Sequence, residues 1–206
     1  MDLPGHGLSG VDRAEWSVAG LGNDIVTVVD HLGVGDIILI GHSMGGPVSL
    51  EAVRLMPGRV YPVIGVDTFQ NVESEWEPEQ TKAMLEAMEA DLVGFCTSFV
   101  TGMFPEAADP DLVASVTDDM CNGPADVGLA LMRDYTDFDR AKAMRSAGVP
   151  VRAVNATLWP TAPEVNRTYA DFDAVLMDDV GHFLMQEAPE EFNRHLRAVI
   201  AELDTG

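Results

Sequence analysis

Basic residues are scarce in this chain. Its 206 residues include 12 Lys and Arg against 34 Asp and Glu, and the formal net charge is −22. A surface this acidic repels the phosphates of nucleic acids and of anionic membranes, whose binding needs Lys and Arg. We therefore expect neither nucleic acid nor membrane among the partners of this acidic protein, and the sequence leaves its oligomeric state open.

Long apolar runs and cysteines are also lacking. No stretch of eighteen apolar residues is present to span a membrane, and no basic start is followed by an apolar signal region. These absences favour a cytoplasmic location. Only Cys96 and Cys121 are cysteines. Two cysteines do not make a disulfide framework, so we interpret them as buried thiols.

What is present indicates a folded α/β protein. The chain length suits one domain, and a hydrophobic content of 47% is enough for a sizeable core. Apolar residues recur at helical spacing in residues 17–32, and again in a final helix with Phe192, Leu196, Val199, Ile200 and Leu203 on one face. Short strands are predicted at residues 36–40, 60–67, 150–156 and 174–177. Strands that alternate with helices predict a doubly wound, mostly parallel sheet, and the β-branched run at 36–40 predicts burial on both faces.

The middle of the chain, residues 68–148, contains no convincing strand. Apolar residues recur there at roughly helical spacing, first around Met84 to Phe99, then around Leu112, and again from Leu129 to Tyr135. We therefore expect a helical segment inserted between two strands of the sheet. Its methionines and aromatic residues could line an apolar pocket, although a methionine stripe is more often ordinary core.

A glycine-rich turn draws attention to Ser43. The segment Gly41-His42-Ser43-Met44-Gly45-Gly46 lies between a predicted strand and a predicted helix that runs from about Pro47 to Met56. In a nucleophile elbow the chain reverses sharply between strand and helix, which leaves the serine in a strained conformation at the edge of the sheet. Glycines at positions 41 and 45 would remove side chains that collide in this turn. The pattern predicts that Ser43 is a nucleophile.

Three motifs together resemble the α/β-hydrolase family, in particular its capped serine hydrolases of the AB hydrolase-1 type. They are the elbow, the segment Asp2-Leu3-Pro4-Gly5-His6-Gly7 near the start and Gly181-His182-Phe183 near the end. Serine first and histidine last is the chain order of this fold. The resemblance implies a core made of residues 1–67 and 149–206, and a helical cap at residues 68–148 that covers the serine.

The resemblance also implies roles for individual residues. Ser43 would be the nucleophile, His182 the general base, and the N–H of Met44 an oxyanion donor. The acid that orients the histidine is less obvious, because residues 155–160, where the family commonly carries it, contain no carboxylate. Asp67 is the first choice, since some members of the fold place the acid after the preceding strand. Glu164 is the alternative, and a helix-capping role for Asp67 stays open.

Compared with the family, the chain begins at the fourth strand. The first three strands and the loop that supplies a second oxyanion donor would then be absent, and the elbow strand would have an unpaired, apolar edge. Three explanations are open: an upstream start codon, a degraded or fragmentary gene product, or a partner that supplies the strands. The first two fit better, because no natural domain boundary falls inside a strand.

The resemblance implies a serine hydrolase that acts on a small ester, lactone or related carbonyl substrate through an acyl-serine intermediate. No metal or organic cofactor is expected. Hydrolysis of carbon–carbon bonds and cofactor-free peroxidase-like chemistry occur in the same fold and stay open. Dehalogenation and epoxide hydrolysis are disfavoured, since they place an aspartate at the elbow. A different class of function is also open: a non-catalytic member that binds or signals with a small ligand, or an inactive fragment.

Overall fold

Four parallel strands form the centre of the protein. The computed structural model describes residues 1–203, and its sheet has the order β1-β2-β3-β4. The strands are β1 (Ile37–His42), β2 (Val60–Val66), β3 (Val151–Ala156) and β4 (Phe172–Met177). Each predicted strand is present, with ends that differ from the predicted ones by at most two residues. Since all strands run the same way, their carboxyl ends lie at one edge of the sheet.

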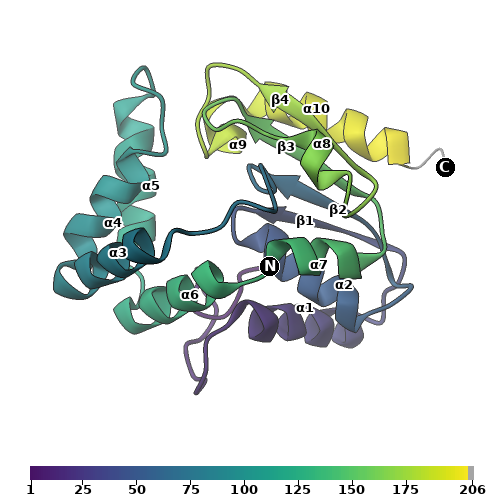
Figure 1. The fold of residues 1–206 in the computed structure, drawn as a ribbon, viewed down its shortest axis with the longest axis horizontal. Coiled ribbons are helices and arrows are strands. Elements are labelled where there is room, and N and C mark those ends of the chain that lie inside the picture. Colours follow the sequence, from purple (N-terminus) through teal and green to yellow (C-terminus); the bar gives the residue numbers. More distant parts are fainter. Residues whose placement is uncertain (204–206) are drawn as a thin grey trace.

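Helices cover both faces of the sheet, as a doubly wound fold requires (Figure 1). On one face α2 (Gly45–Leu55) packs on β1 and β2, and it is flanked by α1 (Val18–Leu32) and α7 (Arg140–Ala147). On the other face α10 (Pro189–Leu203) packs on β3 and on the short helix α9 (Leu184–Glu187). A further short helix, α8 (Pro163–Asn166), packs on β4.

The first helix shows how local sequence sets an element. Ser17 caps its start, because the hydroxyl oxygen accepts a hydrogen bond from the N–H of Gly20 at 3.0 Å. Gly33 ends it in the left-handed conformation, with φ at 64°. Between these ends, an apolar stripe that includes Leu21 and Ile25 is buried against the core. The predicted amphipathic helix is therefore present.

Between β2 and β3 the described chain is helical and contains no strand. It forms α3 (Pro78–Ala90), α4 (Leu92–Thr101), α5 (Pro110–Cys121), α6 (Ala125–Asp137) and then α7. Figure 1 shows α3, α4 and α5 standing beside the sheet, while α6 and α7 lead the chain back towards it. Helices α3 and α4 pack together, as do α4 and α5 and also α3 and α6.

Two predictions about this fold are wrong. Cys96 and Cys121 form a disulfide that joins α4 to α5, with Cα atoms 5.6 Å apart, so they are not free thiols. Helices α4 and α5 pack against each other, and the separation of the two cysteines along the sequence did not indicate that contact. The elbow strand is not buried on both faces either, because Ile40 is 47% exposed. Strand β1 lies at the edge of the described sheet, and α10 packs on β3, two strands away.

Among residues 1–203, no helix is both long enough and apolar enough to cross a membrane.

Candidate functional site

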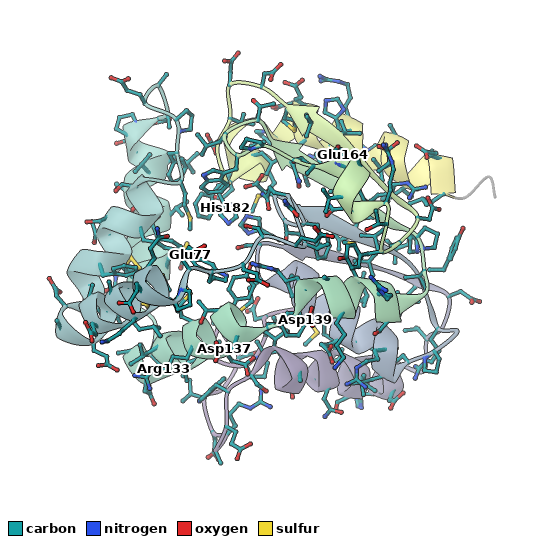
Figure 2. All side chains as sticks on the ribbon, viewed as in Figure 1. Glu77, Arg133, Asp137, Asp139, Glu164 and His182 are labelled. Carbon is teal, nitrogen blue, oxygen red and sulfur yellow. A yellow bond between two sulfur atoms is a disulfide. The ribbon has the colours of Figure 1, made fainter. Side chains whose placement is uncertain are left out.

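Three loops meet at the carboxyl edge of the sheet. Neighbouring strands end in register, with His42 beside Val66 and Val66 beside Val154. Ser43 and Asp67 each come directly after one of these strands, and His182 follows β4. Figure 2 shows His182 on the side of the sheet that faces the helices of the 68–148 segment. The edge of the sheet thus collects the residues singled out from the sequence.

The turn at Ser43 has the geometry of a nucleophile elbow. Ser43 has a φ of 53°, in the left-handed region that non-glycine residues seldom occupy. Its N–H donates to the carbonyl of Val66 at 3.0 Å. A Cβ atom on Gly41 would lie 2.2 Å from the carbonyl oxygen of Gly45, so position 41 requires glycine. A Cβ on Gly45 would meet nothing within 4 Å, so the steric need predicted for that glycine is wrong.

Asp67 and His182 form a buried hydrogen-bonded pair. The Nδ1 of His182 lies 2.6 Å from the Oδ2 of Asp67, and the residues are 6% and 2% exposed. The other carboxylate oxygen of Asp67 accepts from the N–H of Ala156 at 2.9 Å. Because an ionised carboxylate only accepts, Nδ1 of His182 carries the proton. In the tautomer that carries its proton on Nδ1, Nε2 has the lone pair that can take a proton.

Asn155 supports the loop that carries Asp67 and was not recognised from the sequence as part of the site. This side chain is fully buried at the end of β3, where the family commonly has its acid. Its Oδ1 accepts from the N–H of Thr68 at 3.1 Å, and its Nδ2 donates to the hydroxyl of Thr161. The amide thus ties the loop after Asp67 to the neighbouring strand. The only signal for this role in the sequence was that residues 155–160 contain no carboxylate.

Ser43 itself is half-buried. Within residues 1–203, the structure gives its hydroxyl no hydrogen bond, either to His182 or to another group. Met44 is the N-cap of α2, and N–H groups at a helix start have no acceptor inside the helix. Such amides, together with the helix dipole, favour negative charge. This end of α2 suits an oxyanion beside Ser43.

Glu164, the alternative acid, lies in a different place. It is an exposed residue of α8, a helix that packs on β4. Figure 2 labels both residues and shows Glu164 apart from His182. Since Asp67 already occupies Nδ1 of His182, the structure brings Asp67 rather than Glu164 to the histidine.

Two aromatic rings next to His182 were not assigned to the site from the sequence. His42 lies with its ring centroid 4.4 Å from that of His182, and its Nε2 donates to the His182 carbonyl oxygen at 2.8 Å. Removal from water, with the nearby His182 adding to the effect, lowers the pKa of His42 to about 4. Trp159 stands edge-on to His182 at 5.4 Å and is 37% exposed. The available signals in the sequence were the positions of these residues: His42 lies next to Ser43, and Trp159 follows β3.

In the part of the chain that the structure describes, no group of three or more His, Cys, Asp or Glu side chains is arranged to hold a metal ion.

A family model and several curated proteins match this chain. The model of the alpha/beta hydrolase family matches residues 1–195. The 3-oxoadipate enol-lactonase 2 of Acinetobacter baylyi is 22% identical over 206 residues, a match that covers 97% of this chain and 76% of that protein. A shorter match, 42% identical over 60 residues, covers 29% of this chain and 16% of an acetyltransferase component of the acetoin cleaving system of Pseudomonas putida.

Solved structures show the same fold. A thermophilic esterase from Thermogutta terrifontis superposes with a TM-score of 0.81 at 22% identity, covering 98% of this chain and 78% of the esterase. Est816, described as an N-acyl homoserine lactone degrading enzyme, gives a TM-score of 0.81 at 23% identity, with 96% and 80% covered. Fold and family model agree over nearly the whole chain, which therefore belongs to the alpha/beta hydrolase family of enzymes.

Proposed function

We propose that this protein is a serine hydrolase that cleaves a small ester or lactone through an acyl-serine intermediate. The observation that carries the proposal is the 2.6 Å hydrogen bond from His182 to the buried Asp67, at the edge of the sheet where Ser43 is held with a φ of 53°. A serine hydroxyl is a weak nucleophile by itself and needs a base that a third group orients. The chain has a residue for each of these parts.

The reaction would proceed in two halves. Ser43 Oγ attacks the substrate carbonyl while Nε2 of His182 takes its proton, and Asp67 stabilises the imidazolium. Negative charge on the carbonyl oxygen faces the N–H of Met44 at the start of α2. When the intermediate collapses, His182 returns the proton to the leaving alkoxide and an acyl-serine remains. Water, deprotonated by His182, then releases the acid and restores Ser43.

The relatives support an ester or lactone as the substrate. One curated relative is named an enol-lactonase and another, 25% identical over 213 residues, a lipase. Both names describe hydrolysis of a carbon–oxygen bond at a carbonyl. The site itself offers Trp159, whose partly exposed ring beside His182 would contact an apolar portion of the substrate.

The helical segment 68–148 would serve as the cap of this site. Two contacts support that role: the carbonyl of Met103 accepts from the N–H of His182 at 2.9 Å, and the ring of Phe104 stacks on Phe183 at 4.9 Å. Both residues follow α4, so the segment touches the histidine turn directly. A cap in this position would exclude water from the substrate.

Labelling with a fluorophosphonate tests the mechanism, because this reagent reacts with an activated serine. We expect one adduct, located on Ser43 by mass spectrometry, and no adduct in Ser43→Ala. Asp67→Asn should keep the fold and lower turnover of an aryl ester about 10⁴-fold, as expected when the histidine loses its orienting carboxylate. Ser146→Ala changes an exposed serine of α7 and serves as the control. Folded protein that gives no adduct on Ser43 contradicts the proposal.

A further inference from the structure

Glu187 binds the turn that carries His182. It ends the short helix α9, five residues after the histidine. Its two carboxylate oxygens lie 3.0 and 2.9 Å from the N–H of Gly181. Both oxygens of this side chain therefore accept from the amide that directly precedes His182.

Three other polar groups of the turn are bound as well. The N–H of His182 donates to the carbonyl of Met103 at 2.9 Å, and its carbonyl accepts from Nε2 of His42 at 2.8 Å. The carbonyl of Phe183 accepts from the N–H of Glu187 at 3.0 Å. Hydrogen bonds to an ionised group are stronger than those between neutral groups. Glu187 is the carboxylate among these partners, and both of its oxygens bind the amide of Gly181.

The turn that carries His182 has little room to shift while Glu187 stays bound to the N–H of Gly181. A Cβ atom on Gly181 would lie 2.3 Å from the carbonyl oxygen of Met103, so the backbone of the turn already touches the helical segment. The ring of Phe183 stacks on Phe104 of the same segment. Without the carboxylate, the amide of Gly181 would need another acceptor, and a buried amide without an acceptor is costly. Rearrangement of the turn would satisfy this amide.

We propose that Glu187 is a positioning residue for the hydrolysis described above: by binding the amide of Gly181, it holds His182 in the place where Nδ1 bonds to Asp67 and Nε2 serves Ser43. This inference rests on the proposed function. The carboxylate acts through the backbone of the turn and does not touch the reacting atoms. Burial raises the pKa of Glu187, and the hydrogen bond from the N–H of Gly181 opposes this shift.

Kinetics of three variants test the role. Glu187→Ala removes both acceptors, Glu187→Gln keeps one neutral oxygen, and Gln186→Ala changes an exposed side chain of the same helix as a control. We expect Glu187→Ala to lower kcat for an aryl ester about 100-fold, the cost of misplacing a catalytic group by about 1 Å, with KM changed less than twofold. Glu187→Gln should recover part of kcat. Gln186→Ala should match the unchanged protein.

A second measurement does not depend on turnover. In protein with ¹⁵N-labelled histidine, the proton on Nδ1 of His182 should give a downfield NMR signal because of its short bond to Asp67, and Asp67→Asn should remove it. We expect Gln186→Ala to keep this signal and Glu187→Ala to broaden or lose it. If Glu187→Ala keeps both the signal and kcat, or loses only melting temperature, Glu187 is not a positioning residue. If Ser43 is not labelled, the proposed function fails, and the signal still decides the role of Glu187.

Discussion

His42 is expected to make stability depend on pH. Its ring is neutral in the folded protein at pH 7, because burial lowers its pKa to about 4, and its Nε2 donates to the His182 carbonyl. An unfolded chain exposes the same ring to water, where its pKa is 6.5. Between these two values the unfolded state binds a proton that the folded state does not. The free energy of unfolding must therefore fall as the pH falls through this window.

The size of the effect follows from the two pKa values. They differ by about 2.5, and each pKa unit corresponds to about 1.36 kcal/mol, so the full contribution of His42 is about 3 kcal/mol. It is fully present above pH 6.5 and is lost as the pH approaches 4. Between pH 7.5 and pH 5, linkage gives a loss of about 2 kcal/mol.

Urea unfolding at pH 7.5 and pH 5 measures this loss. His42→Gln removes the titrating ring and keeps an N–H donor for the carbonyl of His182. His31→Gln, an exposed position of α1, is the control. Between the two pH values, the unchanged protein and His31→Gln should each lose about 2 kcal/mol more than His42→Gln. Equal losses in all three proteins would refute the assignment of a neutral, desolvated His42.

Three further predictions concern the elbow, the substrate and the disulfide. Gly41→Ala should lower the free energy of unfolding by about 3 kcal/mol in urea titrations, since its Cβ meets the backbone of Gly45, whereas Gly45→Ala should cost almost nothing. Trp159→Ala should raise KM for phenyl acetate about tenfold, equivalent to about 1.4 kcal/mol, and change KM for ethyl acetate little; equal changes would contradict contact with an apolar group. Reduction of Cys96–Cys121, which are 25 residues apart, should lower the free energy of unfolding by about 3 kcal/mol, and Cys96→Ser should make stability insensitive to dithiothreitol.

The local pattern of the sequence determined the elements that position the site. Gly41 to Gly46 between a β-branched run and a helix predicted a strained Ser43, and the backbone there has that conformation. The order of strands and helices predicted the parallel sheet, and family membership confirms the fold. Such features are readable because turns, caps and periodicity depend on neighbours a few residues apart. The catalytic roles of Ser43 and His182 stay predictions until labelling tests them.

Other features depended on contacts between distant segments, and only the tertiary structure decided them. Asp67 is 115 residues from His182, so the sequence made Asp67 the first choice but left Glu164 as an alternative until the folded chain brought Asp67 and His182 together. The disulfide between α4 and α5 and the exposed Ile40 likewise follow from which helix packs where. The contact of Glu187 with Gly181 joins residues that are close in the sequence, but its proposed role depends on His182, which lies between them. The sequence determined the elements and the turn at Ser43, and packing decided which side chains share the site, because spatial proximity across the sheet leaves no local pattern in the chain.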